Sequence, residues 1–308
     1  MESADSERGD EVRPYDALPF IQGTPEWVEA RRRLGITASE VGAACGVGRY
    51  GGPFDVYSFH KGLRPDLIPT EPMIWGTILE EPVAQYGAKE LGIKVRRVRR
   101  LLQSRIYPWL LCSLDRIGSD GNLVEVKTTG EFAKDWGEAE TEQVPADPMC
   151  QVQTQMAVTG AKGCHVFVLF GGQRFRKFHV PRNDDQIADI AEITRQLWEQ
   201  IQEGTIPEID GSEGATAWLN SHYAPTGTAI EASPSARELA FEYLGIVAAT
   251  KAADARKAEI ANLLKAEMGE ATVATGDDIK ITWTMQAGST YTVTKQPTRV
   301  LRVSHLEA

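Results

Sequence analysis

The sequence predicts an α/β (α+β) fold with a mixed sheet, and three observations indicate it. Predicted helices and strands follow the order helix–strands–helix–strands–helix, which is typical of one sheet covered by helices. Two short turns, Asp120-Gly121 and Gly171-Gly172, each separate apolar segments as in a β-hairpin. An apolar stripe with helical spacing follows the second turn and comprises Ile187, Ile190, Ile193, Leu197 and Ile201.

The first half of the chain contains three predicted helices and three predicted strands. PEWVEARRRLG, residues 25–35, reads as a helix, and Thr37 or Ser39 is expected to cap the next one. A third helix is predicted within 75–91, and Pro82 either starts it or bends it. Strands follow at about 93–102, 107–116 and 122–129.

The second half repeats this alternation. Asp147 is expected to cap a helix that begins with Pro148 and ends before Gly160. The segments 164–170 and 174–180 are apolar and alternating, so they are expected to pair around the second turn. The long amphipathic helix then completes the sheet domain.

Four regions are expected along the chain. Glycine, proline and threonine concentrate around 205–232, which is typical of a linker. Beyond it, Ser233 caps a predicted helix to about Met268, either one long helix or a broken pair. IKITWTM and TRVLRVS alternate like strands of a small β unit. The predicted regions are a disordered head, a core, a linker and a C-terminal helix with that β unit, at 1–19, 20–205, 206–232 and 233–308.

Composition narrows the possible functions. The chain has 308 residues, 42% of them hydrophobic, and no apolar run approaches the roughly 20 residues that span a bilayer. We therefore expect no membrane association and a cytoplasmic location. The four cysteines form no C-x-x-C pair, so neither zinc nor an iron–sulfur cluster is expected. A net charge of −10 argues against a uniformly basic nucleic-acid surface but allows a local basic channel.

The hairpin around Asp120 carries charges that need an explanation. Side chains two apart on a strand share a face, so Glu125 and Lys127 point the same way. With the turn centred on Asp120 and no bulge, Asp115 lies opposite Glu125, and Ser113 opposite Lys127. Two carboxylates about 5 Å apart repel by roughly 3 kcal/mol at an effective dielectric near 20.

A divalent cation would relieve that repulsion. Oxygen ligands with open positions suit Mg²⁺ or Mn²⁺, and Lys127 could orient an attacking water and offset charge on a phosphate. Taken alone, the D-x₉-E-x-K spacing is weak, because charged alternation is common on solvated strands. Four further features have compatible positions: Gly76-x-x-x-Glu80, the Gln151/Gln155 pair, the GITAS segment with its hydroxyls, and Trp27-x-x-x-Arg31.

These motifs together resemble the phage lambda exonuclease/YqaJ-type viral recombinase family of PD-(D/E)xK nucleases. The resemblance covers about residues 20–205 and depends on WVEARRRLGITASEV, WGTILEEPV, CSLDRIGSDGNLVEVK and MCQVQTQMAVTG. It implies a restriction-endonuclease-like core with a C-terminal appendage. It also implies catalytic and metal-binding roles for Glu80, Asp115, Glu125, the Val126 carbonyl, Lys127 and Gln151.

The resemblance further implies a pocket for the 5′-phosphate of DNA. Ser39, Ser113 and an arginine would form it, and Thr37 supplies another hydroxyl at the same helix start. Spacing from Trp27 selects Arg31, whereas spacing back from Ser39 selects Arg32, so both stay candidates. Leu114 stands where the family pattern has its first proline.

The family implies a Mg²⁺-dependent 5′→3′ exonuclease that acts on double-stranded DNA ends. Mn²⁺ is expected to substitute, and the 3′ single-stranded tails would serve a strand-annealing protein in phage homologous recombination. Lambda-type members form ring-shaped trimers, so a homo-oligomer is expected. The alternatives are a non-catalytic DNA-end-binding adaptor for an annealing protein and a related PD-(D/E)xK endonuclease.

Overall fold

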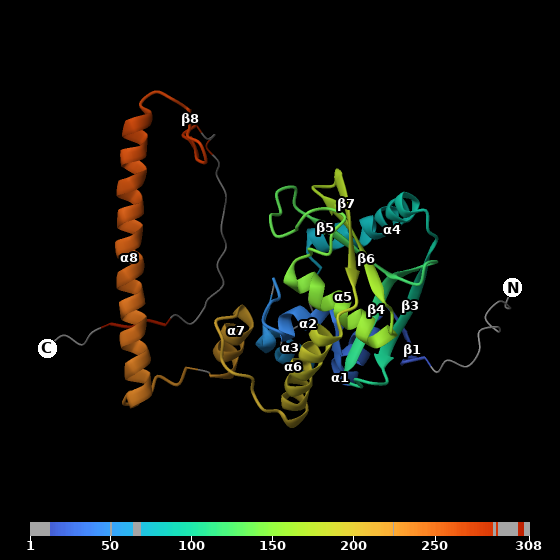
Figure 1. Ribbon diagram of the computed structural model, residues 1–308. Helices are drawn as coiled ribbons and strands as arrows, with labels where there is room; N and C mark the ends of the chain where they lie inside the picture. Colours follow the sequence, from blue (N-terminus) through green and yellow to red (C-terminus); the bar gives the residue numbers. More distant parts are fainter. Residues whose placement is uncertain are drawn as a thin grey trace. The chain divides into compact units, whose positions relative to one another are not determined.

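The computed structural model describes residues 13–49, 51–63, 69–223, 225–285, 288 and 301–304. The chain forms two compact units, Met1–His222 and Tyr223–Ala308, whose elements are coloured along the sequence in Figure 1. No helix in these described ranges is both long and apolar enough to cross a bilayer.

The first unit is built on one mixed sheet. Its strands are β1 Tyr15–Ile21, β2 Ile36–Thr37, β3 Val95–Ser104, β4 Leu110–Gly118, β5 Leu123–Thr129, β6 Gly163–Phe170 and β7 Arg174–Pro181. Their order is β1-β3-β4-β5-β6-β7, with β2 added to β4. The pairs β2–β4 and β5–β6 are parallel, and the others are antiparallel. The predicted mixed-sheet fold is confirmed, including both hairpins.

Helices cover both faces of this sheet (Figure 1). The helices of this unit are α1 Pro25–Leu34, α2 Ala38–Ala44, α3 Pro53–His60, α4 Glu71–Leu91, α5 Ala146–Thr159, α6 Asp184–Glu203 and α7 Glu213–His222. Phe167 of β6 packs against Val83 of α4, whereas its neighbours Val166 and Val168 pack in the main core with Val152 of α5. Because successive strand residues face opposite sides, α4 and α5 lie on opposite faces of the sheet.

The structure departs from the expected region boundaries at two places. Strand β1 begins at Tyr15, inside the expected 1–19 head, and pairs with β3; residues 1–12 lie outside the described residues. The register shifts between Leu18 and Ile21, around Pro19, and proline is tolerated in edge strands such as this one. The proline also explains why the sequence did not predict this strand. Helix α7 lies inside the expected 206–232 linker, because Ala215 and Trp218 bury against Phe54.

Helix α4 is longer than predicted and continuous through Pro82. It begins at Glu71, and Pro82 neither starts nor ends it. Proline removes one hydrogen bond to the preceding turn, and at this exposed position water can satisfy the freed carbonyl. The helix packs closely on the sheet, because a Cβ at Gly87 would clash with the Phe167 ring.

The second unit contains one long helix and a short hairpin. Helix α8, Pro234–Met268, is capped by Ser233, whose hydroxyl accepts from Ala236 N, so a single helix replaces the alternative of a broken pair. Strands β8 Val273–Thr275 and β9 Lys280–Thr282 pair in an antiparallel manner. Of the second predicted strand, 298–304, residues 298–300 lie outside the described residues, and 301–304 form no strand.

Candidate active site

The β4–β5 hairpin brings the predicted acids together where its two strands separate. Arg116 pairs with Val124, and the same register continued by one residue places Asp115 opposite Glu125, as predicted. The described backbone pairing of β4 with β5 ends before this point. The Val126 N–H instead donates to Asp115 Oδ2 at 2.8 Å, so a carboxylate replaces a backbone acceptor at the mouth of the hairpin.

Glu125 is the hub of the resulting cluster. Its side chain is only 4% exposed, and Lys127 Nζ lies 2.7 Å from Glu125 Oε1. Helix α5 supplies two amides: Gln151 Nε2 donates to Glu125 Oε1 at 2.6 Å, and Gln155 Nε2 to Oε2 at 2.8 Å. Lys127 Nζ also donates to Gln151 Oε1 at 2.7 Å. The predicted Glu125, Lys127 and Gln151 therefore form one closed hydrogen-bonded group.

The electrostatics of this group centre on Asp115. Burial raises the pKa of Asp115 well above its ordinary value, and the nearby carboxylates of Glu125 and Glu80 raise it further. Burial alone would lower the pKa of Lys127, but its contact with Glu125 outweighs this and leaves that pKa raised. The cluster thus holds a firmly cationic lysine beside carboxylates that repel each other.

The backbone of Ser113 contacts the Glu125 cluster, whereas its side chain contacts helix α1. Gln155 Nε2 lies 3.4 Å from the Ser113 carbonyl oxygen, while the Ser113 hydroxyl accepts from Trp27 Nε1 at 3.2 Å. The described β4–β5 pairing ends at Arg116 and Val124, so no backbone pairing among the described residues holds Ser113 opposite Lys127. The hydroxyl bonds to α1 rather than to the lysine.

Glu80 lies close to the cluster but has a cationic partner of its own. Arg116 Nη1 is 2.6 Å from Glu80 Oε1, and Arg116 Nη2 is 2.7 Å from Glu81 Oε2. Arg116 is 2% exposed, so it needs these carboxylates to compensate its buried charge. Arg97 lies 2.8 Å from Glu81. Arg116 was not predicted from the sequence; its signal is a second charged residue directly after Asp115 in a largely apolar strand.

The cluster fits a hard divalent cation held by few protein ligands. Asp115 and Glu125 supply adjacent carboxylates, and no hydrogen bond reaches Asp115 Oδ1 in the part of the chain that the structure describes. Among those residues no group of three or more His, Cys, Asp or Glu side chains forms a closed metal cage. Mg²⁺ typically binds one or two carboxylates and completes its shell with water and phosphate oxygens. The carboxylates of Asp115 and Glu125 fit this mode of Mg²⁺ coordination.

A cavity of about 960 Å³ gives access to the cluster. Lys127 and Gln151 line it from the sheet and from α5, and Trp75 and Leu79 line it from α4. Trp75 is 52% exposed. Lys127 and Gln151 are therefore reachable by a polymer that lies against α4.

A second group of predicted residues assembles at the start of α2. Arg31 Nη2 lies 3.1 Å from Thr37 Oγ1 and 3.4 Å from Ser39 Oγ. The Arg31 guanidinium also lies over the Trp27 ring, 4.4 Å from its centroid, and Trp27 bonds to Ser113. Arg31 Nε is buried without a hydrogen-bond partner among the described residues, so the group contains one unsatisfied donor.

Arg32 lies elsewhere. Its Nε donates to the Phe59 carbonyl at 3.1 Å, and its Nη1 lies 3.2 Å from Glu29 Oε2. The structure therefore groups Arg31, not Arg32, with Thr37, Ser39 and the Trp27–Ser113 pair.

Glu40 holds Thr37 of this second group by two hydrogen bonds. Thr37 N and Thr37 Oγ1 donate to Glu40 Oε2 at 2.9 Å and 2.6 Å. Burial would raise the pKa of Glu40, but Arg31, His60 and Thr37 lower it to about 2. Glu40 thus remains ionised and fixes both the helix start and the arginine.

Comparisons with known proteins identify related sequences. Residues 26–162 match the YqaJ-like viral recombinase domain family, a range that contains every candidate residue above. The uncharacterized protein YqaJ of Bacillus subtilis (strain 168) is 30% identical over 254 residues, covering 80% of this chain and 78% of that protein.

Solved structures give weaker similarities. An alkaline exonuclease (LHK-Exo) from Laribacter hongkongensis is 19% identical with a TM-score of 0.46, covering 59% of this chain and 94% of its own. A phage related exonuclease from Haemophilus somnus 129PT is 8% identical with a TM-score of 0.44, covering 56% and 96%. The extent and identity of the Bacillus match, together with the matched domain, establish the family: the chain belongs to the YqaJ-like viral recombinase domain family.

Proposed function

We propose that the protein is a Mg²⁺-dependent deoxyribonuclease that digests duplex DNA from 5′ ends and leaves 3′ single-stranded tails. The observation that carries the proposal is the contact of Lys127 with Glu125 and Gln151 beside the buried Asp115 carboxylate. Membership of a viral recombinase family supports a role in phage DNA recombination.

Each residue of the cluster has a distinct part in this mechanism. When bound, Mg²⁺ would supply Lewis-acid stabilisation of phosphate oxygens and a more acidic water, with Asp115, Glu125 and the Val126 carbonyl as its proposed ligands. Lys127 places an ammonium group where negative charge develops and can hold the attacking water. Gln151 orients Lys127 and Glu125 together, because it bonds to both. Glu80 adds negative charge beside Asp115.

Metal addition tests the proposal directly. Linear duplex DNA labelled at either the 5′ or the 3′ end is incubated with the protein in Mg²⁺ or in excess chelator. We expect early release of the 5′ label as mononucleotide, persistence of the 3′ label on a single strand, and no digestion with chelator. Circular duplex should resist, because it has no end. Digestion of the circle would indicate an endonuclease, and DNA binding without hydrolysis would indicate an adaptor.

The Arg31 group predicts a preference for phosphorylated ends. Arg31→Ala should reduce the rate advantage of 5′-phosphate over 5′-hydroxyl duplexes by at least about tenfold, because hydrogen bonds to charged groups contribute about 1.5–3 kcal/mol each. Arg32→Ala is the matched control and should keep the advantage, since Arg32 bonds to Phe59 and Glu29. Equal rates on both ends by the unmodified protein, or a larger loss in Arg32→Ala, would exclude this pocket.

Assembly and partners complete the proposal. The family resemblance supports a homo-oligomer, with a trimer as the expected state, and a strand-annealing protein that takes up the 3′ tails. Such a system would act in the cytoplasm of the phage host.

A further inference from the structure

One face of α4 connects the active-site cavity to a second cavity. Pro72, Trp75 and Leu79 line the first cavity, and Leu79, Val83 and Tyr86 line the second. Their spacing of three or four residues places them on one helix face, and Leu79 belongs to both cavities. From Pro72 to Tyr86 this face extends over about 21 Å of α4, which is about 30 Å long in all.

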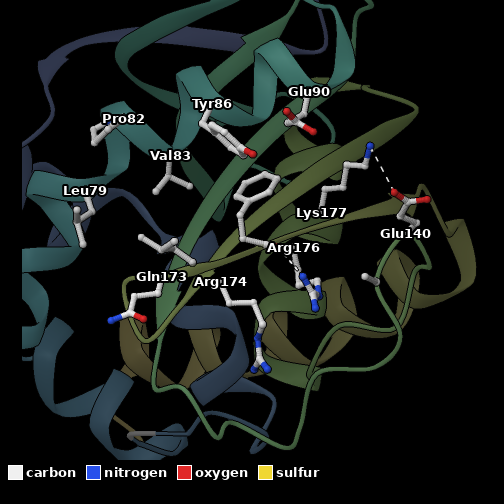
Figure 2. Close-up of a pocket in the computed structure, with 13 residues that line it drawn as sticks. Leu79, Pro82, Val83, Tyr86, Glu90, Glu140, Gln173, Arg174, Arg176 and Lys177 are labelled. Atoms are coloured by element: carbon white, nitrogen blue, oxygen red, sulfur yellow. Dashed lines mark hydrogen bonds and ion pairs between the residues drawn. The ribbon is translucent and has the colours of Figure 1, made fainter.

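The second cavity, here named the α4–β7 groove, has an apolar floor with an exposed aromatic ring. Its volume is about 930 Å³, and Figure 2 shows α4 side chains on one side and β7 side chains on the other. Tyr86 stands edge-on to Phe175 with ring centroids 4.9 Å apart. Tyr86 is nevertheless 50% exposed, so part of its ring is open to a ligand.

The rim of the groove is basic on the β7 side. Arg174, Arg176 and Lys177 line it, against Glu90 and Glu140. Lys177 lies 3.5 Å from Glu140, which neutralises that pair. Arg174 and Arg176 are exposed and bond to backbone carbonyls, and no ion pair joins either to an acidic side chain within the described residues. Two uncompensated guanidinium groups stand out in a protein of net charge −10.

We propose that the α4–β7 groove binds a single DNA strand that runs along α4 to or from the catalytic cluster. Exposed aromatic rings beside basic side chains are the usual platform for single strands, because every base can stack and every phosphate is anionic. Tyr86 would stack on a base, and Arg174 and Arg176 would contact phosphates. This inference rests on the proposed function, because it takes DNA as the substrate of the cluster.

Binding without hydrolysis tests the groove. Fluorescence anisotropy of a labelled oligothymidylate of about ten nucleotides is measured in excess chelator, within the usual size range for such sites. Tyr86→Ala should weaken binding by about tenfold, since base stacking contributes about 1–3 kcal/mol. Tyr86→Phe should bind like the unmodified protein, because the ring remains. Thermal melting confirms that each variant is folded.

The charge on the rim is tested by salt dependence. Arg174→Gln combined with Arg176→Gln should lower the slope of log K against log salt by about 1.4, because each phosphate contact to a single strand contributes about 0.7. Lys89→Gln is the matched control, because Lys89 is an exposed cation of α4 that lines neither cavity. Its slope should not change.

The outcomes separate this inference from the proposed function. Unchanged affinity in folded Tyr86→Ala, or an unchanged slope in the double arginine variant, overturns the groove; an extended acidic peptide as the true occupant would give this result. Groove-dependent binding by a protein that digests no DNA would instead overturn the nuclease and leave the groove. Metal-dependent digestion with groove-independent binding would overturn the groove alone.

Discussion

Lys127→Ala is expected to reduce Mg²⁺-dependent digestion of duplex DNA by about 10²- to 10³-fold, the usual loss when a preorganised electrostatic donor is removed. The ammonium group is the cation that the cluster places between Glu125 and Gln151. The fold should survive, because Glu125 keeps hydrogen bonds from Gln151 and Gln155. Initial rates on end-labelled duplex measure the effect, and circular dichroism verifies the fold.

A surface lysine provides the control for this variant. Lys162 is exposed and lies outside the cluster, so Lys162→Ala should digest DNA at the unmodified rate. Normal digestion by purified, folded Lys127→Ala would remove Lys127 from the mechanism.

Asp115→Asn is expected to eliminate Mg²⁺ binding and digestion while leaving the metal-free fold at least as stable. Asparagine can still accept the Val126 N–H bond that Asp115 Oδ2 accepts. It also removes a negative charge that burial and the carboxylates of Glu125 and Glu80 disfavour. A ligand that binds only the folded state raises its melting temperature, so Mg²⁺ should raise Tm in the unmodified protein and not in the variant.

The metal assignment depends on the difference between the two thermal shifts. Asp189→Asn removes an exposed carboxylate of α6 and should keep the full Mg²⁺-dependent shift. An equal shift in Asp115→Asn would show that the cation binds elsewhere, and a large loss of metal-free stability would show that Asp115 has a structural role instead.

Local sequence features predicted the hairpin and its acids well. The Asp120-Gly121 turn and the strand period of two determine the β4–β5 register, because both act between neighbouring residues. Gly121 adopts a φ of 85°, a conformation that glycine readily supplies. The Arg116–Val124 pair then leaves Asp115 opposite Glu125.

Other features were beyond local reasoning. Three consecutive arginines, Arg31 to Arg33, have the same local chemistry, and spacing arguments favoured two of them equally. Their roles differ only because Arg31 reaches the Thr37 and Ser39 hydroxyls while Arg32 reaches Phe59 and Glu29. Helix α7 escaped prediction for a similar reason, because its stability comes from burial of Trp218 against Phe54.

The sequence by itself determined the helix–strands–helix–strands–helix order of the main elements, both hairpin turns and the alignment of Asp115 with Glu125. These depend on backbone preferences and on contacts between residues close along the chain. Only the tertiary structure decided which arginine joins the Thr37–Ser39 group and that Arg116 holds Glu80. It also decided that one face of α4 lines two cavities. The physical reason is that those arrangements require segments distant in sequence to pack against one sheet, and no local pattern encodes the distances between them.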